Sequence, residues 1–302
     1  MGTGCVPQLA QSSRTILTFL VSEEGKTMPD PFYGHQPAEG LHVLKDAWCQ
    51  KAHFGVQSRE LAESGRLSAA IAATFAAAPV RQQEFRLSRS VAEDIHESQQ
   101  ERRLESAMMR RWGSAGMWPV PGAWIRLVAC QVPLFNQQLR DGWGYIDLLG
   151  VTTNGLPVVV ELKKPARACA DGKTDATETP LRMVLEAATY AIAIRKNWNH
   201  GFRDEWLKRL QDIDFERRVI EQLPERIEEI RLVAAAPASY WIDWLPVTDK
   251  GRTVSRETWE SFRLLLAEFA NLHLPVSFVS ISGHDQNPNG LAVQPLSFPL
   301  VV

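Results

Sequence analysis

The distribution of apolar and polar positions divides the chain into helical and strand-like segments. Helical spacing or composition covers residues 39–78, 91–112, 181–198, 203–229 and 255–272. Short apolar runs that are typical of strands cover residues 124–135, 145–151, 156–162, 231–236 and 275–282. Loops are expected at residues 112–122 and 165–179, and an extended tail after Gly283. This order predicts an α/β fold with a mixed central sheet flanked by helices.

Turn and capping residues support three of these boundaries. Thr153-Asn-Gly155 predicts a tight hairpin turn between two strands, because Asn-Gly tolerates positive φ angles. Pro180 is well placed to open the helix that follows it, and Ser255 can cap the last helix. The stretch from Tyr145 to Leu162 is therefore expected to form two paired strands.

Two regions differ in character. Residues 1–90 are expected to be a mainly helical N-terminal extension, and they carry no chemistry that the sequence identifies. Residues 91–302 hold the predicted sheet and are expected to form the principal domain. Met28 is an alternative start, in which case residues 1–27 would be an upstream extension.

Composition is that of an ordinary globular protein. Of the 302 residues, 45% are hydrophobic and 23% are charged. No apolar run reaches the roughly 18 residues of a membrane helix, and the N-terminus lacks the features of a signal peptide. The cysteines have neither zinc-ligand spacing nor a disulfide pattern, and they stand at Cys5, Cys49, Cys130 and Cys169. These features predict a cytoplasmic protein with reduced thiols.

The charge balance limits how this chain would bind nucleic acid. A net charge of -2 means that any basic footprint must be local. The candidate basic side chains are Arg102, Arg103, Arg110, Arg111, Lys163, Lys164, Arg167 and Lys173, although each is equally well explained as a solvated surface charge. Trp241 and Trp244 could stack on bases, but core packing is the preferred interpretation.

The most informative residues lie on the predicted hairpin. Asp147 and Glu161 flank the turn, so adjacent antiparallel strands would place them side by side. Glu161 and Lys163 are two residues apart and project from the same face of one strand. Two carboxylates brought together in an apolar strand repel each other unless a cation compensates them, and carboxylates suit Mg²⁺. The alternative is a structural pair that forms salt bridges to Lys163 and Lys164.

Asp147 followed by strand, turn and Glu161-Leu-Lys163 resembles the PD-(D/E)XK nuclease superfamily. The resemblance covers roughly residues 95–200 and implies a restriction-endonuclease-like core. It also implies an upstream helix that supplies Glu105, with Glu101 as second choice. A downstream helix would carry Glu186 and, four residues later, Tyr190. Glu186 stands where this superfamily frequently has Gln, and the loop from Lys164 to Thr179 is long.

The resemblance implies a Mg²⁺-dependent endonuclease that acts on DNA, with Mn²⁺ as a possible substitute. Expected metal ligands are Asp147, Glu161, the Leu162 carbonyl and Glu105. Lys163 would orient or activate the attacking water, with Glu186 at the edge of the catalytic group. Expected contacts to nucleic acid come from Lys164, Arg182 and Tyr190.

Two other hypotheses remain open at this point. The chain could be a catalytically inactive nucleic-acid-binding or regulatory protein on the same fold, or an α/β protein whose acidic pair is structural. The sequence also leaves open a homodimer, because cutting both strands of DNA often takes two active sites.

Overall fold

The computed structural model divides the chain into two compact units, Met1–Gln36 and Pro37–Val302. The residues that it describes are 20–21, 27–28, 39–47, 51–88, 95–96, 98–113, 116–120, 123–134, 143–165, 167–168, 174–175, 178–244 and 254–296. In the first unit, strands β1 (Leu20–Val21) and β2 (Thr27–Met28) pair antiparallel. The candidate chemistry lies in the second unit.

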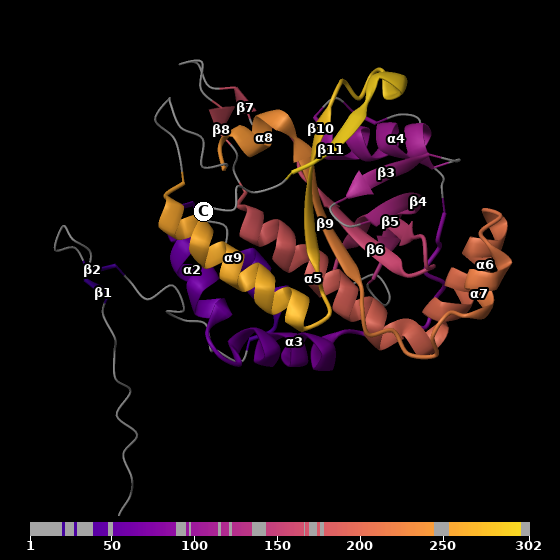
Figure 1. The fold of residues 1–302 in the computed structure, drawn as a ribbon, viewed down its shortest axis with the longest axis horizontal. Coiled ribbons are helices and arrows are strands. Elements are labelled where there is room, and N and C mark those ends of the chain that lie inside the picture. Colours follow the sequence, from indigo (N-terminus) through magenta and orange to yellow (C-terminus); the bar gives the residue numbers. More distant parts are fainter. Residues whose placement is uncertain are drawn as a thin grey trace, which may run out of the picture. The chain divides into compact units, whose positions relative to one another are not determined.

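A seven-stranded mixed sheet forms the centre of the second unit, in the order β11-β10-β9-β6-β5-β4-β3 (Figure 1). Its strands are β3 (Met117–Val120), β4 (Ala123–Pro133), β5 (Tyr145–Thr152), β6 (Pro157–Leu162), β9 (Arg231–Pro237), β10 (Val276–Ser282) and β11 (Ala292–Pro295). The strands from β3 to β6 form an antiparallel meander. Strand β9 then pairs parallel with both β6 and β10. The predicted α/β fold with a mixed central sheet is confirmed.

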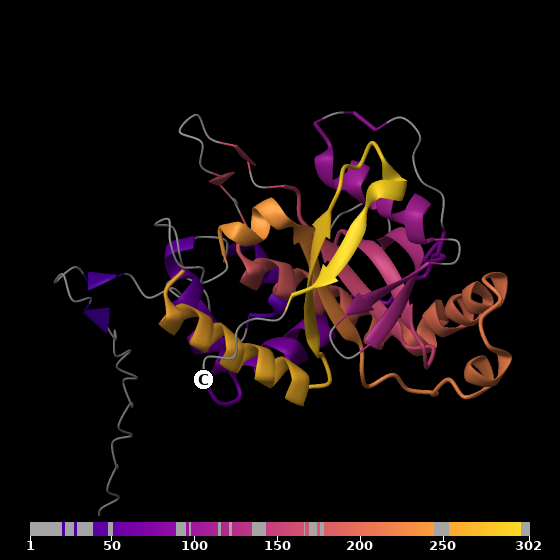
Figure 2. The ribbon, with the colours of Figure 1, turned by 45° about the horizontal axis from the view of Figure 1, so that its top comes forward.

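The sheet is strongly curved, and its edge strand β11 contacts the opposite edge strand β3 (Figure 2). The curvature encloses a core in which helix α4 (Gln100–Trp112) packs on β4. Met108 from this helix, Leu148 and Val160 from the sheet, and Trp118 from β3 are all buried in that core. Burial of so many large apolar side chains is the main stabilising term for this unit.

Helix α5 (Pro180–Asn197) packs on the central strands β6 and β9. Most of its positions are buried, which explains why its sequence is apolar nearly all round. Thr179 caps it by accepting a hydrogen bond from the Arg182 N–H, and Pro180 occupies its first turn as predicted. The helix therefore holds its polar side chains in fixed positions against the sheet.

The N-terminal helices pack onto this framework. They are α1 (Leu41–Ala47), α2 (Phe54–Ala62) and α3 (Arg66–Ala77), preceded by the short 3₁₀ turn η1 (Lys51–His53) before α2. Helix α1 contacts α5, and α2 contacts α9 (Arg256–Asn271), which Ser255 caps as expected. A separate extension ending at residue 90 stays a prediction, but its helices contribute packing and charges next to α5.

Several sequence predictions about local structure are wrong. The helix expected over residues 91–112 begins at Gln100, and that expected over residues 203–229 is divided into α6 (Arg203–Asp212) and α7 (Arg217–Glu221). Asp214 at φ 52° ends the helical path between these two helices. The tail after Gly283 is not merely extended, because it contains the 3₁₀ turn η3 (Pro288–Gly290) and β11.

The remaining elements are short. Strands β7 (Arg167–Ala168) and β8 (Thr174–Asp175) pair within the expected polar loop, and residues 117–120 form β3 where a loop was expected. The π-helical segment η2 (Trp198–Phe202) follows α5, and α8 (Ala238–Ile242) follows β9. None of the described helices is long and apolar enough to cross a membrane.

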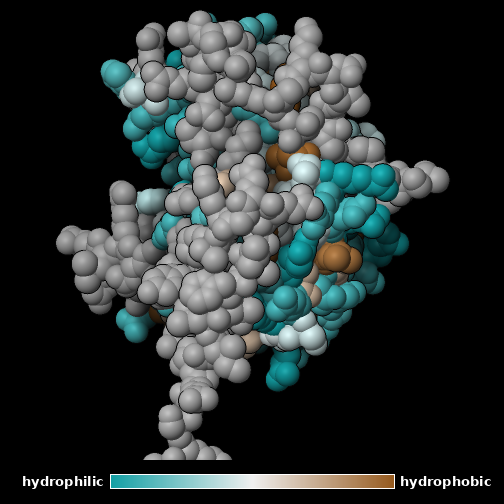
Figure 3. Space-filling view, turned by 90° about the vertical axis from the view of Figure 1, so that its left-hand side faces the viewer, coloured by the Kyte–Doolittle hydropathy of each residue, from teal (hydrophilic) through white to brown (hydrophobic). Residues whose placement is uncertain are grey.

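Exposed apolar side chains are scattered among the described residues. The large ones include Trp124, Ile242 and Leu264, which come from different elements. On the face drawn in Figure 3, the coloured surface is mainly hydrophilic, with small separate hydrophobic spots. Isolated exposed apolar residues of this kind are normal for a protein surface.

Candidate functional site

The β5–β6 hairpin brings the two predicted carboxylates together. The antiparallel register of β5 and β6 ends at the pair Leu148–Val160, and Asp147 and Glu161 are the next residues on the two strands. Residues opposite each other in an antiparallel pair point to the same face of the sheet. Asp147 Oδ2 also accepts a hydrogen bond of 2.9 Å from the Leu162 backbone N–H. The expected proximity of the two side chains is confirmed, because the charge of Asp147 acts directly on Glu161 and helps raise its pKa.

Lys163 is buried directly after β6 and is enclosed by carboxylates. Its Nζ atom lies 2.8 Å from Glu161 Oε1, 2.6 Å from Glu186 Oε2 and 2.9 Å from Glu178 Oε2. Its backbone N–H donates to the Ala235 carbonyl of β9. Burial of an ammonium group is tolerated here because its charge is compensated at short range.

Helix α5 supplies the far side of this network. Glu186 lies one turn after Arg182, whose Nε is 3.4 Å from Glu186 Oε1. Arg182 also lies 3.7 Å from Glu178 and 3.8 Å from Asp46, which α1 contributes. The predicted Glu186 thus belongs to the site, and Arg182 is held by carboxylates from three segments.

Glu105 approaches from α4. Its Oε2 accepts a hydrogen bond of 2.6 Å from Gln131 Nε2. Gln131 has a φ angle of 51°, which is strained for a residue other than glycine, and β4 has a register shift between Leu127 and Ala129. The strained backbone of β4 therefore aims an amide at the carboxylate of Glu105.

Glu101, the second choice for the helix carboxylate, has a different contact. Its Oε1 accepts a hydrogen bond of 3.1 Å from the backbone N–H of Lys164. The Lys164 residue is exposed. Glu101 therefore anchors the chain just after Lys163.

Tyr190 is buried one turn after Glu186 on α5. Its hydroxyl lies close to Gly144, where an added Cβ would come within 3.3 Å of it. Gly144 has a φ angle of 52°, which glycine adopts without strain. Lys45 Nζ lies 5.6 Å from the centroid of the Tyr190 ring. Tyr190 is thus fixed between the start of β5 and helix α1.

The carboxyl groups are difficult to ionise in this environment. Burial and the neighbouring charge of Asp147 raise the pKa of Glu105 to about 9. Burial raises the pKa of Asp147 to about 7, although Lys163 and the Leu162 N–H oppose the shift. Burial and Asp147 raise the pKa of Glu161 well above its usual value. If Glu105, Asp147 and Glu161 were all ionised, their negative charge would exceed the positive charge that nearby side chains provide.

Lys163 and Glu186 behave in the opposite way. Burial alone lowers the pKa of Lys163, but Glu161, Glu186 and Glu178 outweigh burial and raise it well above its usual value. Burial opposes ionisation of Glu186, but Lys163 and hydrogen bonds lower its pKa to about 2. Lys163 is therefore an ammonium ion at neutral pH, paired above all with an ionised Glu186.

Metal-binding capacity rests on oxygen atoms at the end of the hairpin. Glu161 Oε2 is buried and receives no hydrogen bond from a described residue. Within the described part of the chain, no group of three or more His, Cys, Asp or Glu side chains is arranged to hold a metal ion. This end of the hairpin therefore offers a cation the carboxyl groups of Asp147 and Glu161, both with raised pKa values, and Oε2 of Glu161 is the most available oxygen.

Two residues of the site were missed from the sequence. Glu178 precedes α5 and is the third carboxylate on Lys163, and Gln131 holds Glu105. An acid just before the first turn of a helix is a weak signal for Glu178. Nothing in the sequence marks Gln131, because its role depends on a backbone distortion in β4.

Two of the candidate basic residues have partners within the protein, and the basic footprint as a whole stays a prediction. Arg103 forms an ion pair of 2.7 Å with Asp285, and the guanidinium of Arg111 lies over the ring of Trp112. Lys173, Cys5, Cys49 and Cys169 lie outside the described residues. Cys130 is a buried free thiol. Trp241 and Trp244 are 1% and 0% exposed, which confirms their assignment to the core.

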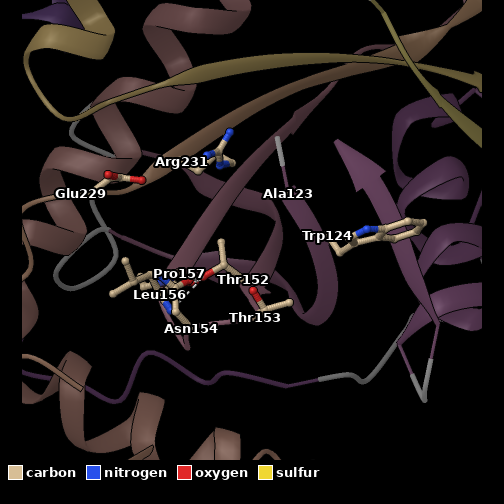
Figure 4. Close-up of a pocket in the computed structure, with 9 residues that line it drawn as sticks. All are labelled: Ala123, Trp124, Thr152, Thr153, Asn154, Leu156, Pro157, Glu229 and Arg231. Carbon is tan, nitrogen blue, oxygen red and sulfur yellow. Dashed lines mark hydrogen bonds between the residues drawn. The ribbon is translucent and has the colours of Figure 1, made fainter. Parts of the chain in front are cut away.

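A cavity of about 450 Å³ lies at the opposite end of the same hairpin. It is lined by Thr152 and Asn154 from the turn, by Trp124 from β4, and by Glu229 and Arg231 before and at the start of β9 (Figure 4). From Pro157 to Glu161, β6 spans roughly 13 Å at the usual rise per residue. This cavity is therefore separate from the cluster around Lys163.

Comparison of the chain with protein-family models, with curated proteins and with solved structures found no match.

Proposed function

We propose that this protein is a Mg²⁺-dependent endonuclease that hydrolyses phosphodiester bonds of DNA. The observation that carries the proposal is the placement of Asp147 opposite Glu161, next to the ammonium group of Lys163. These are the residue types and the strand positions by which the sequence resembles PD-(D/E)XK nucleases. The charge deficit among the carboxyl groups favours a divalent cation as the missing partner.

The topology supports a restriction-endonuclease-like core. Helix α4 precedes the antiparallel strands β4, β5 and β6, and α5 then leads to β9, which lies parallel to β6. This order matches what the resemblance implies: an upstream helix with an acid, a hairpin with the catalytic pair, and a downstream helix. The strong curvature of the sheet and the outer strands β3, β10 and β11 lie outside what the resemblance implies.

The proposed ligands of Mg²⁺ are Asp147, Glu161, the Leu162 carbonyl and Glu105. All of them are oxygen donors of the kind that a hard cation binds. Among the described residues the three carboxyl groups are not already arranged around a metal position, so they would have to draw together on the ion. When bound, Mg²⁺ or Mn²⁺ would polarise the phosphodiester and lower the pKa of a coordinated water. Its charge would also allow the three carboxyl groups to ionise at neutral pH.

Lys163 would act as a fixed cation. Its raised pKa makes it a poor base at neutral pH, so it would orient the attacking water and stabilise negative charge that develops on phosphorus. Glu186 and Glu178 hold its ammonium group in position. Lys164, Arg182 and Tyr190 would lie beside the bound DNA.

The test is DNA cleavage in Mg²⁺ by Asp147→Asn and Glu161→Gln variants. Each substitution replaces a buried carboxyl group that is hard to ionise with an amide of the same shape, so the fold should persist. We expect each to lower the rate by at least about 100-fold. Glu229→Gln, which neutralises a carboxylate at the opposite end of the hairpin, should cleave like the parent. Equal cleavage by all four proteins would overturn the proposal.

A second candidate is an inactive nucleic-acid-binding protein on the same scaffold. It is favoured by the closed network around Lys163, in which three carboxylates lie within 2.9 Å of the ammonium group. The two functions differ in their response to metal. Tight DNA binding with no cleavage at any Mg²⁺ or Mn²⁺ concentration would favour the second candidate.

A further inference from the structure

A cavity of about 290 Å³ lies between α4, the end of β9 and the turn that follows β10. We call it the α4 cavity and define it by Gln100, Leu104, Pro165, Ser239, Ile281 and His284. Its volume is close to the lower limit of small-molecule sites, which is roughly 300 Å³. A flat ring system of one or two rings is the kind of group that fits such a space.

The α4 cavity is lined by residues that neighbour the proposed catalytic residues along the chain. Leu104 is the neighbour of Glu105, and Pro165 follows Lys163 by two positions. Pro237, which also lines the cavity, ends the strand whose Ala235 carbonyl accepts the Lys163 N–H. The hydrogen bond from the Lys164 N–H to Glu101 also joins the chain after Lys163 to the start of α4, next to Gln100. A nucleotide next to the phosphate at the carboxylate pair is therefore the part of a DNA strand that we expect at this cavity.

Charge in the α4 cavity favours a neutral group over a phosphate. Arg103 on the cavity wall is paired with Asp285, which also lines the cavity, at 2.7 Å. Both side chains are partly buried, with exposed fractions of 21% and 24%. The guanidinium is thus already neutralised, and an incoming phosphate would meet the Asp285 carboxylate as well.

The distribution of apolar and polar atoms suits a nucleobase. Leu104 and Ile281 are buried and form an apolar floor, and the rings of Pro165 and Pro237 add to the apolar lining. Gln100, Ser239 and His284 lie in more accessible positions and offer both hydrogen-bond donors and acceptors. An apolar surface for the ring face with polar groups for the ring edge is how enzymes hold a base outside the helical stack.

We propose that the α4 cavity binds the base of a nucleotide next to the scissile phosphate. This inference rests on the proposed nuclease function and adds that the substrate must present an unstacked base. Single-stranded DNA, a flap or a locally opened duplex supplies such a base at lower cost than a regular duplex.

The test uses DNA oligonucleotides in which one abasic site is moved across the positions that flank the cut. Cleavage in Mg²⁺ is measured as kcat/KM for the parent and for Ser239→Phe, which fills the cavity. Ser64→Phe, at an exposed turn between α2 and α3, is the matched control. In the parent we expect one position at which loss of the base lowers kcat/KM by about 10-fold or more.

Ser239→Phe should lower cleavage of intact DNA by a similar factor and should no longer respond to the abasic site. Ser64→Phe should behave like the parent. If Ser239→Phe does not fold, the Gln100→Ala and His284→Ala pair replaces it, with the same loss of sensitivity expected. A parent that cleaves with no sensitive position, or a sensitivity that survives in the cavity variants, overturns this inference alone. A parent that neither binds nor cleaves DNA overturns the proposed function as well.

Discussion

The two ends of the β5–β6 hairpin carry polar groups of opposite kinds. At the turn, Thr152 Oγ1 donates to Asn154 Oδ1 at 2.6 Å and accepts from the Leu156 N–H at 3.1 Å. At the other end, Glu161, Glu178 and Glu186 share the ammonium group of Lys163, and Asp147 accepts a hydrogen bond from the Leu162 N–H. The turn is neutral, and each of these partners is supplied within five residues. At the charged end, by contrast, the partners come from the separate elements α4, α5 and β9.

The comparison distinguishes two kinds of polar group. Those at the turn stabilise the hairpin, whereas the carboxyl groups at the other end are available to a ligand. Hydrogen bonds at the turn contribute to the local fold and leave little for a ligand to satisfy. Carboxyl groups with raised pKa values do the opposite, because they cost stability when they ionise. Perturbed ionisation of this kind is a recognised mark of functional sites.

The largest expected effect on stability comes from removing the ammonium group of Lys163. Lys163→Met leaves Glu161, Glu178 and Glu186 without their shared cation, so the free energy of unfolding at pH 7.5 should fall by about 3–5 kcal/mol. Urea denaturation measures the loss. Thr152→Val, a substitution of similar shape at the turn, should cost only about 1 kcal/mol. Similar losses for the two variants would mean that the ends do not differ as described.

The next largest effect concerns how stability depends on pH when no metal ion is added. The pKa values of Asp147 and Glu105 are raised in the folded state to about 7 and about 9. The folded state therefore binds more protons than the unfolded state, and stability falls as pH rises from about 4 to 9. Glu105→Gln removes one of these groups, so its stability should fall less steeply over that range. Denaturant midpoints measured at pH 5, 7 and 9 test this, and a steeper fall in the variant would contradict it.

The smallest effect belongs to the turn. Gly155 has a φ angle of 82°, and an added Cβ would lie 2.9 Å from Val219 Cγ1 and 3.0 Å from Leu223 Cδ2. Gly155→Ala should therefore lower the free energy of unfolding by about 1–2 kcal/mol. Because the charged end is remote, the variant should keep the parent's response to Mg²⁺ in thermal unfolding. A lost Mg²⁺ response would show that the two ends are coupled.

Local pattern was enough to predict the hairpin and its charged end. Three local features predict how Asp147, Glu161 and Lys163 are placed. They are the β-branched run before Glu161, the Asn-Gly turn, and the period of two residues along the strand. Glu186 followed from helical spacing and the family resemblance. These features depend on neighbours within one or two elements.

Features that depend on distant partners were not predictable in the same way. Strands β3 and β11 are short edge strands of four residues, each with a proline, and pairing with β4 and β10 defines them. The Asp46–Arg182 contact joins α1 to α5, and the Gln131–Glu105 contact joins β4 to α4. Each requires the packing of the whole unit, which single-sequence periodicity does not contain.

The two pairings of β6 imply an order of assembly. Its antiparallel partner β5 is joined to it by the turn that ends at Leu156, so the hairpin closes a short loop at small entropic cost. Its parallel partner β9 begins only at Arg231, and such non-local pairings form slowly. We therefore expect Asp147 and Glu161 to meet early in folding, and Lys163 to be anchored to the Ala235 carbonyl late. A partly folded chain would then hold the acidic pair before the ammonium group of Lys163 is fixed beside Glu161.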